Sequence, residues 1–296
     1  MKLKMVGLGK MGFNLALNMK DHEVDVEGFD VNEEARKKAE ESGIKSYETL
    51  KDLVSADQKD VIWVMLPAGK ITNSVLDELS GLCKKGDIVI DGGNSDHRDS
   101  LKTAKKMEEK GIYFFDIGTS GGVYGARHGA SFMCGGDPEV FKNDLQEMLE
   151  SIATTNGCLY TGKTGSGHYL KMIHNAMLYG YMQTLGEGFE LLEKSEFDYD
   201  LEHVADSLSK SSVIRGWLLE LAANAFRKDP DLEKIKGVVG ASKTTGWTIE
   251  SACELGVPIP IISTSLRLRS KQDDSFSAKV IASLRDEVGG HKAQSK

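Results

Sequence analysis

A cation, an imidazole and an amide lie within five residues of one another just past the middle of the chain. They are Lys171, His174 and Asn175, in the run GSGHYLKMIHNAMLY over 165–179. The run predicts a helix on which Lys171 and Asn175 share one face and His174 flanks it. Such a face could bind a polyol acid and take the proton of one of its hydroxyls. Because polar helical faces are usually only solvated, the neighbouring segments must indicate whether this one borders a cleft.

A glycine-rich turn near the N-terminus, GLGKMG over 7–12, has the spacing of a dinucleotide-binding loop. It follows a strand-like run over 2–7 and precedes an apolar helical run over 13–19. Gly7 permits the tight turn, Gly9 lets a pyrophosphate approach the backbone, and Gly12 lets helix and strand pack closely. We expect these glycines, with Lys10 and Met11, to bind the cofactor.

The next expected strand, over 23–29, ends at Asp30, which is 18 residues beyond Gly12. A carboxylate at this place binds the adenosine ribose and repels a 2′-phosphate, so the sequence favours NAD over NADP. Arg36, Lys37 and Lys38 follow one turn or more further on, and they keep NADP open as an alternative.

Three further loops follow expected strands, over 60–66, 87–91 and 113–117. Ligands of open α/β sheets bind beyond the carboxyl ends of the strands. We therefore expect the cofactor to contact residues of the first two loops, namely Leu66, Pro67, Ala68 and Asn94. The third loop holds Ser120, Gly121 and Gly122, whose hydroxyl and backbone N–H groups suit a carboxylate.

Strands and helices alternate up to about residue 160, after which helical patterns dominate. This order predicts an α/β chain, with a Rossmann doubly wound parallel sheet over 1–162 and an all-helical domain over 163–296. The helices expected in the second domain span 168–194, 201–208, 213–228, 248–255, 261–271 and 276–288.

The composition is that of a soluble globular protein, with 40% hydrophobic and 28% charged residues and a net charge of −8. The sequence contains neither a basic nucleic-acid-binding arm nor an apolar run of membrane-spanning length. Its four cysteines are scattered without a CxxC pair. We therefore expect reduced thiols, no metal, no nucleic-acid or membrane partner, and a cytoplasmic location.

Together these motifs resemble the short, NAD-preferring bacterial 6-phosphogluconate dehydrogenases of the β-hydroxyacid dehydrogenase superfamily. The resemblance covers essentially the whole chain. It rests on GLGKMG (7–12), LPAG (66–69), DGGNSDHRDS (91–100), SGGVYGARHGASFMCGGD (120–137), KMIHN (171–175), GWTIESACELGVPIP (246–260) and RDEVGGH (285–291). It implies oxidative decarboxylation of 6-phosphogluconate, a small-molecule sugar acid, to ribulose 5-phosphate, with NAD as cofactor, in a homodimer or homotetramer.

The resemblance also implies residue roles. Lys171 matches the general base for the C3 hydroxyl, and burial beside a cationic nicotinamide would lower its pKa enough for this role. His174 and Asn175 complete the catalytic set. Arg269 matches a phosphate-binding arginine, and Arg285 and His291 match residues that reach the phosphate, usually across a dimer interface. The implied substrate-binding residues are Asn94, Ser120, Gly121, Gly122, Lys171, His174, Asn175, Tyr179, Arg269, Arg285 and His291.

One position departs from the family pattern. After KxxHN the family continues GIEYG, with the glutamate as general acid, whereas this chain reads AMLYG and has Leu178 there. Glu187 and Glu190 are roughly 13–18 Å further along the expected helix, and a water, Tyr179 or another side chain could replace the acid. Two alternatives stay open. One is an NAD-dependent dehydrogenase of a related sugar acid with a different anionic tail and weak or no decarboxylation, and the other is an NAD-binding pseudoenzyme.

Overall fold

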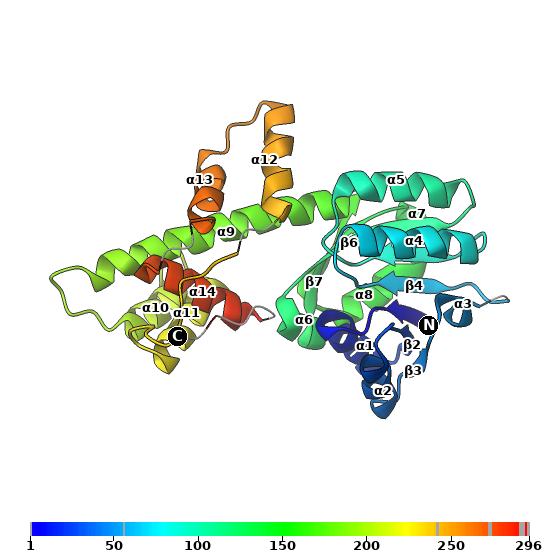
Figure 1. Cartoon of the computed structure of the whole chain (residues 1–296), viewed down its shortest axis with the longest axis horizontal. Coiled ribbons are helices and arrows are strands. Elements are labelled where there is room, and N and C mark those ends of the chain that lie inside the picture. Colours follow the sequence, from blue (N-terminus) through cyan, green and yellow to red (C-terminus); the bar gives the residue numbers. More distant parts are fainter. Residues whose placement is uncertain (1, 56, 241–242, 272–273, 290–293, 295–296) are drawn as a thin grey trace. The chain divides into compact units, whose positions relative to one another are not determined.

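The computed structural model describes residues 2–55, 57–240, 243–271, 274–289 and 294. The chain forms two compact units, Met1–Met172 and Ile173–Lys296. The division falls inside the longest helix, α9 (Ser166–Glu193). Figure 1 labels the elements along the chain.

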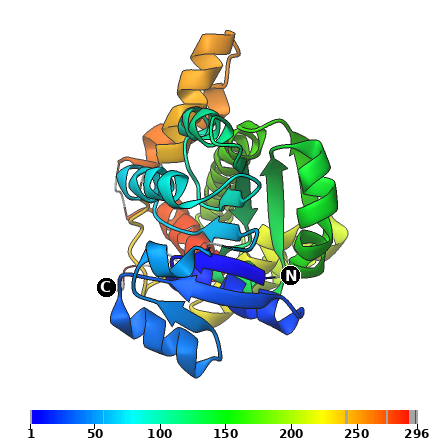
Figure 2. The same cartoon turned by 90° about the vertical axis from the view of Figure 1, so that its right-hand side faces the viewer.

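The first unit is built on an eight-stranded sheet with strand order β3-β2-β1-β4-β5-β6-β7-β8 (Figure 2). The reversal of strand order between β1 and β4 is that of a doubly wound fold, which confirms the predicted class. The strands are β1 (Lys2–Val6), β2 (Asp25–Phe29), β3 (Lys45–Tyr47), β4 (Val61–Val64), β5 (Ile88–Asp91), β6 (Tyr113–Ser120), β7 (Ala130–Gly135) and β8 (Ala153–Gly162).

Helices connect most of these strands, and several begin at a side chain that caps the first turn. Asn32 accepts a hydrogen bond from the Glu34 N–H, and Asp96 accepts one from the Arg98 N–H. The helices of this unit are α1 (Lys10–Asp21), α2 (Glu33–Glu41), α3 (Leu50–Leu53), α4 (Lys70–Leu82), α5 (His97–Glu108), α6 (Gly122–His128), α7 (Pro138–Val140), a π-helical turn (Phe141–Leu145) and α8 (Gln146–Ile152).

Both faces of the sheet are buried, and its central strand β4 is apolar at every position. On β4, Trp63 belongs to a core shared with Phe13 of α1 and Leu149 of α8. Ile62, from the same strand, belongs to a second core shared with Leu76 of α4. The continuous apolar runs in the sequence therefore reflect a sheet covered by helices on both faces.

One strand pairing departs from the parallel arrangement that the sequence predicts, because β6 and β7 are antiparallel. Only Gly121, the seven-residue helix α6 and Gly129 connect them, whereas a parallel crossover needs a dozen or more residues. Gly129, with φ of 128°, lets the chain reverse. The edge strand β8 is an addition to the predicted strands, since its polar residues (ATTNGCLYTG) show no clear apolar alternation.

Helices form the second unit, and its described residues contain no strand, in agreement with the all-helical prediction. After α9 come α10 (Leu201–Ser211), α11 (Trp217–Lys228), α12 (Lys243–Leu255), α13 (Pro260–Arg269) and α14 (Phe276–Val288). Phe189 of α9 packs with Phe226 of α11 and Ile281 of α14 in one core. Across the described ranges, every helix is too short or too polar to cross a membrane.

A buried ion pair stabilises the amino end of the sheet. Lys4 on β1 is 1% exposed, and its Nζ lies 2.8 Å from Asp60 Oδ1 and 2.6 Å from Ser55 Oγ. The Ser55 N–H donates to the other Asp60 oxygen over 2.6 Å. The buried ammonium group of Lys4 and the carboxylate of Asp60 therefore neutralise each other.

Lys4→Met should lower the free energy of unfolding by about 3–5 kcal/mol, because it leaves the Asp60 carboxylate buried without its cation. Urea denaturation would measure the change. Lys37→Met is the matched control, since Lys37 and its partner Glu33 are each 67% exposed, and exposed pairs contribute only ~0–1 kcal/mol. Equal effects of the two substitutions would contradict this assignment.

Candidate active site

The glycine-rich turn joins β1 to α1 in a conformation that requires glycine. Gly7 has φ of 98°, and a Cβ there would lie 2.5 Å from the Met65 carbonyl oxygen. A Cβ at Gly12 would collide with the Gly7 carbonyl oxygen. Gly9, at the N-cap of α1, has open space around it and supplies no side-chain cap. The first N–H groups of α1 are therefore available to an anion.

A cavity of about 340 Å³ lies beside this turn, at the carboxyl ends of the central strands. It brings together eight of the ten residues that the sequence predicts at the cofactor, Gly9, Lys10, Met11, Gly12, Leu66, Pro67, Ala68 and Asn94. Gly7 and Asp30 are not among its lining residues. Met65, Gly92, Gly93 and Thr119 also line it. These four are not among the residues predicted at the cofactor, although each lies at or just beyond a strand end.

Asp30 lies at the end of β2, and two backbone groups fix its carboxylate. The Leu8 N–H donates to Oδ2 over 2.7 Å, and the Asn32 N–H donates to Oδ1 over 2.8 Å. Since Leu8 belongs to the glycine-rich turn, this contact ties Asp30 to the turn. Arg36 donates from Nη1 to the Asp30 backbone oxygen and has Nη2 3.6 Å from Glu48.

Lys171 lies in the second turn of α9 and is 5% exposed. Burial lowers its pKa to about 7, from the ordinary lysine range above 10. A Cβ added to Gly118 of β6 would lie 2.8 Å from Lys171 Cγ, so the strand backbone is in direct contact with the lysine stem. Thr119, the next residue on β6, lines the 340 Å³ cavity. The lysine with a lowered pKa is thus next to the strand end that borders the cavity.

Gly118→Ala should lower kcat by about 10–100-fold, because the added methyl group must displace Lys171 from its position, and small misplacements of a catalytic group are costly. The KM for the nicotinamide cofactor should change little. Steady-state kinetics and the Tm would measure both effects.

Gly81→Ala is the control for Gly118→Ala, since no atom lies within 4 Å of the Cβ position at Gly81 on α4. Wild-type kcat in Gly118→Ala would show that Lys171 does not depend on this contact.

Ser120, Gly121 and Gly122 end β6 and begin α6, as a turn with φ of 124° at Gly121 and 62° at Gly122. Thr119 Oγ1 donates to the Gly92 carbonyl oxygen over 3.2 Å. The turn is therefore held beside the loop that carries Asn94, although its three residues do not line the cavity.

The remaining predicted residues belong to the second unit. His174 Nδ1 lies 3.2 Å from Asn175 Oδ1 on α9. Tyr179 and Arg269 stack, with the guanidinium carbon 3.7 Å from the ring centroid. Arg269 is 4% exposed and donates from Nη2 to the Gly240 carbonyl oxygen over 3.0 Å. Within the described part of the chain, its Nε and Nη1 have no hydrogen-bond partner.

Arg285 lies near Tyr179 and Arg269 in the same chain. Burial lowers the pKa of Arg269 to about 10, and the neighbouring Arg285 charge also lowers it. Burial likewise lowers the pKa of Arg285, while Tyr179 raises it. Two partly desolvated cations in one place favour an anion between them. His291, predicted at the same end of the substrate, lies outside the described residues.

Leu178 packs against the hydrophobic core of the second unit. Of the two glutamates further along α9, Glu190 accepts a hydrogen bond from the Ser277 N–H over 3.1 Å, and Glu187 accepts one from Gln183 Nε2 over 2.8 Å. Both are therefore engaged in contacts of their own.

The sequence matches two family models in succession. Residues 2–162 match the NAD binding domain of 6-phosphogluconate dehydrogenase, and residues 167–292 match the 6-phosphogluconate dehydrogenase C-terminal domain.

Curated proteins of similar length match the whole chain. A Bacillus subtilis protein, YqeC, whose name assigns it provisionally to the 6-phosphogluconate dehydrogenases, is 45% identical over 299 residues, with 100% of both chains covered. The NAD(+)-dependent, decarboxylating 6-phosphogluconate dehydrogenase of Haloferax volcanii is 39% identical over 302 residues, which cover 100% of this chain and 99% of its own.

Among solved structures, the 6-phosphogluconate dehydrogenase of Plasmodium falciparum superposes with a TM-score of 0.81 at 29% identity. The match covers 97% of this chain and 64% of that one. The Plasmodium protein is described in its apo form, with its cofactor NADP+ and with its substrate 6-phosphogluconate.

Proposed function

The chain belongs to the 6-phosphogluconate dehydrogenase family and is an oxidoreductase of this type, and from this premise we propose that it oxidises 6-phosphogluconate at C3 with NAD and releases CO₂ to form ribulose 5-phosphate. The observation that carries the proposal is Lys171, a buried lysine with a pKa lowered to about 7. It contacts β6 next to Thr119, which lines the 340 Å³ cavity.

The residues around the cavity fit a dinucleotide. Gly9 leaves open space where a side chain would block a pyrophosphate, and the N-terminus of α1 has no side-chain cap. Asp30 presents a fixed carboxylate that retains lone pairs for ribose hydroxyls. A bound NAD would supply the hydride acceptor. The same carboxylate supports NAD over NADP, because it would repel a 2′-phosphate.

Lys171 acts on the substrate in two ways in this proposal. Its neutral Nζ takes the proton of the C3 hydroxyl as the alcohol is oxidised to a ketone. The ammonium group that results then stabilises the negative charge that develops on the ketone oxygen when the β-keto acid loses CO₂. Asn94, Ser120 and the glycines after it would orient the sugar acid, as would His174 and Asn175. Arg269 and Arg285 would hold its phosphate, because they are a buried and a half-buried cation with N–H groups to donate.

Leu178 favours a second candidate, an NAD-dependent dehydrogenase of a related sugar acid that decarboxylates weakly or not at all. A leucine cannot protonate the enediol that forms after CO₂ is lost. Glu187 and Glu190 are not obvious replacements for the family's glutamate, since Glu187 accepts a hydrogen bond from Gln183 of α9 and Glu190 accepts one from the Ser277 N–H of α14.

One assay separates these candidates. Purified protein is mixed with NAD and 6-phosphogluconate, and NADH and CO₂ are followed together. Equal amounts of the two products would support the proposal. NADH without CO₂ would favour the second candidate. Bound NAD without either product would indicate another substrate or a chain that binds NAD without turnover.

We also propose that the protein acts in the cytoplasm as a homodimer or homotetramer. Large apolar side chains are exposed in the second unit, among them Leu255 at 66%, Val257 at 51% and Ile261 at 69%. Contiguous patches of exposed apolar side chains often mark an interface, and these three residues are close in sequence. Sedimentation or mass photometry would measure the oligomeric state, and a monomer at working concentration would contradict the proposal.

A further inference from the structure

The residues of the first unit that are proposed to act on or orient the substrate come from three segments that are far apart in the sequence. Asn94 follows β5, Ser120 ends β6, and Lys171 is on α9. Lys171 Nζ is at the end of a long side chain, and a displacement of about 1 Å can cost ~10²-fold in rate. The three segments must therefore be held in a fixed register.

Asp116 holds α9 against β6. It is 0% exposed, and its two carboxylate oxygens accept hydrogen bonds from the Gly165 N–H over 2.6 Å and the His168 N–H over 2.7 Å. A Cβ at Gly167 would collide with the Asp116 carbonyl oxygen. The N-terminal turn of α9 is thus capped by a carboxylate of the sheet and packs directly on the strand backbone.

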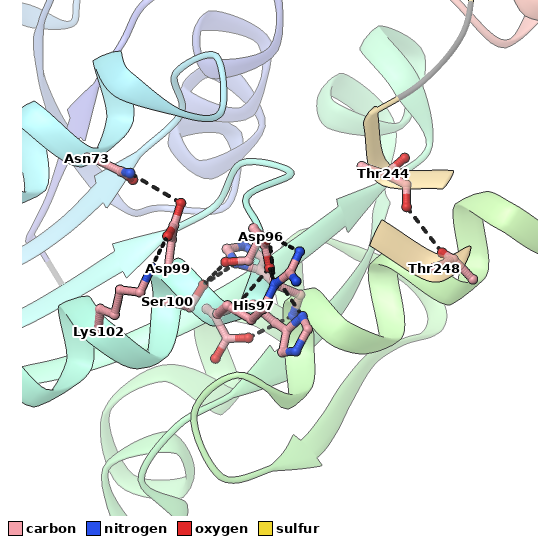
Figure 3. A network of polar contacts seen from close by, with 11 residues as sticks. Asn73, Asp96, His97, Asp99, Ser100, Lys102, Thr244 and Thr248 are labelled. Atoms are coloured by element: carbon pink, nitrogen blue, oxygen red, sulfur yellow. Dashed lines mark hydrogen bonds and ion pairs between the residues drawn. The ribbon is translucent and has the colours of Figure 1, made fainter. Parts of the chain in front are cut away.

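His168 joins the same turn of α9 to α5. The imidazole is 1% exposed, and its Nδ1 lies 2.8 Å from Ser100 Oγ. Ser100 Oγ also lies 3.3 Å from the Asp96 carbonyl oxygen, so a Ser100 hydroxyl that donates to this oxygen accepts from Nδ1 of the imidazole. Figure 3 shows Ser100 beside Asp96 at the start of α5. Asn94 is two residues before Asp96, so the bond to Ser100 anchors the loop that carries it.

Packing alone does not explain why a histidine occupies position 168, because its other ring nitrogen destabilises the fold. Nε2 is buried and has no hydrogen-bond partner among the residues that the structure describes, and an unpaired buried polar atom costs about 1–3 kcal/mol. A phenylalanine would fill a similar volume without this cost. Ser100, His168 and Asp116 also do not form a nucleophilic triad, because Ser100 is 2% exposed and Asp116 binds backbone N–H groups.

We propose that His168 is a positioning residue, which holds Lys171 in register with the Asn94 loop through its Nδ1 bond to Ser100 and its backbone bond to Asp116. The role of Lys171 in this inference rests on the proposed function. The hydrogen bonds themselves belong to the free protein, so they can be tested apart from turnover.

The test uses His168→Phe, His168→Asn, Ser100→Ala and the double variant His168→Phe/Ser100→Ala in the full chain. His168→Phe should lower kcat by about 10-fold or more, with the KM for NAD within about twofold of wild type. Its free energy of unfolding should not fall, because the unpaired nitrogen is removed together with the bond. His168→Asn places an amide nitrogen near the Nδ1 position and should keep kcat within about threefold of wild type.

Ser100→Ala should lower kcat by a similar factor to His168→Phe, and the double variant should be no slower than His168→Phe alone, because both remove one bond. Thr103→Val is the matched control, since Thr103 is a buried hydroxyl residue on the same helix, 9% exposed, outside this set of bonds. Wild-type kcat in His168→Phe would overturn the proposal. The proposal would also be overturned if His168→Asn were as slow as His168→Phe. The same holds if the double variant lowered kcat by the product of the factors for His168→Phe and Ser100→Ala.

Hydrogen exchange of the NAD-free proteins separates this inference from the proposed function. Amides 165–171 should exchange faster in His168→Phe than in wild type and at the wild-type rate in His168→Asn. If wild type does not oxidise 6-phosphogluconate but this exchange pattern holds, the proposed substrate is wrong. The hydrogen bond from His168 to Ser100 is then still confirmed as the contact that holds the start of α9. Equal exchange rates in all three proteins would contradict the positioning role of the His168–Ser100 hydrogen bond, whatever the substrate.

Discussion

Lys171→Met is expected to abolish the oxidation of 6-phosphogluconate, with kcat lowered on the order of 10²–10⁴-fold, the range that general-base catalysis supplies. Methionine has a similar length and fits the apolar contact with Gly118, so the change removes the amine and keeps the packing. Binding of NAD should persist, because Lys171 does not line the dinucleotide cavity. Stopped-flow measurement of NADH would report the chemical step, and equilibrium titration would report NAD binding.

The matched control is Lys163→Met, which removes an exposed lysine three residues before α9 begins. It should leave kcat and NAD binding near wild type. Turnover close to the wild-type rate in Lys171→Met would rule out Lys171 as the base.

The pH dependence of kcat/KM is a second test of Lys171 as the general base. Because burial lowers the Lys171 pKa to about 7, the neutral amine that accepts a proton becomes the major form above about pH 7. In wild type, kcat/KM should therefore rise with pH through about 7 and then level off. A rate that keeps rising up to the ordinary lysine range would contradict the buried-base assignment.

The free energy of unfolding should also depend on pH through Lys171, and its lowered pKa fixes the sign of that dependence. Between about pH 7 and the ordinary range above 10, an unfolded lysine binds a proton that the folded Lys171 does not. Stability of wild type should therefore rise with pH across this window, and Lys171→Met should lack that part of the slope. Urea denaturation at neutral and alkaline pH would measure it. An inactive variant that is at least as stable as wild type at pH 7 separates lost chemistry from misfolding.

Much of this fold could be predicted from local sequence, because its signals are short-range. The spacing of Gly7, Gly9 and Gly12 after an apolar run encodes the turn. The apolar runs that form β4 and β5 encode a sheet covered on both faces. The same reasoning put most of the cofactor residues at strand ends, where a single cavity now collects them.

The contacts that determine the state of Lys171 could not be predicted in this way. Gly118 is one glycine within a strand, and nothing local indicates that it faces a lysine 53 positions later. The hydrogen bonds of Asp116 to α9 and of His168 to Ser100 likewise join residues about 50 to 70 positions apart. The antiparallel turn into β7 depends on the length of α6, which the motif SGGVYGARHG does not disclose.

Asp30→Ala is expected to lower the preference for NAD over NADP, as the ratio of the two kcat/KM values, by about 100-fold. Losing a charged acceptor for the ribose hydroxyls costs about 1.5–3 kcal/mol of NAD binding, and removing the carboxylate ends its repulsion of a 2′-phosphate. Arg36, now held at the Asp30 backbone oxygen, would then be close enough to pair with that phosphate. In the double variant Asp30→Ala/Arg36→Ala, kcat/KM with NADP should therefore not rise, while kcat/KM with NAD should stay as low as in Asp30→Ala.

Two further variants separate charge from structure in this prediction. Asp30 also anchors the Leu8 N–H of the glycine-rich turn, so Asp30→Asn, which keeps an acceptor of the same shape, should lose less NAD activity than Asp30→Ala. Asp25→Asn makes the same change of charge at the exposed start of β2, about 16 Å away along the strand, and should leave the ratio unchanged. An unchanged ratio in Asp30→Ala would show that this carboxylate does not bind the ribose. A ratio that shifts equally in Asp25→Asn would mean that overall charge, and not a contact at the end of β2, governs the choice of cofactor.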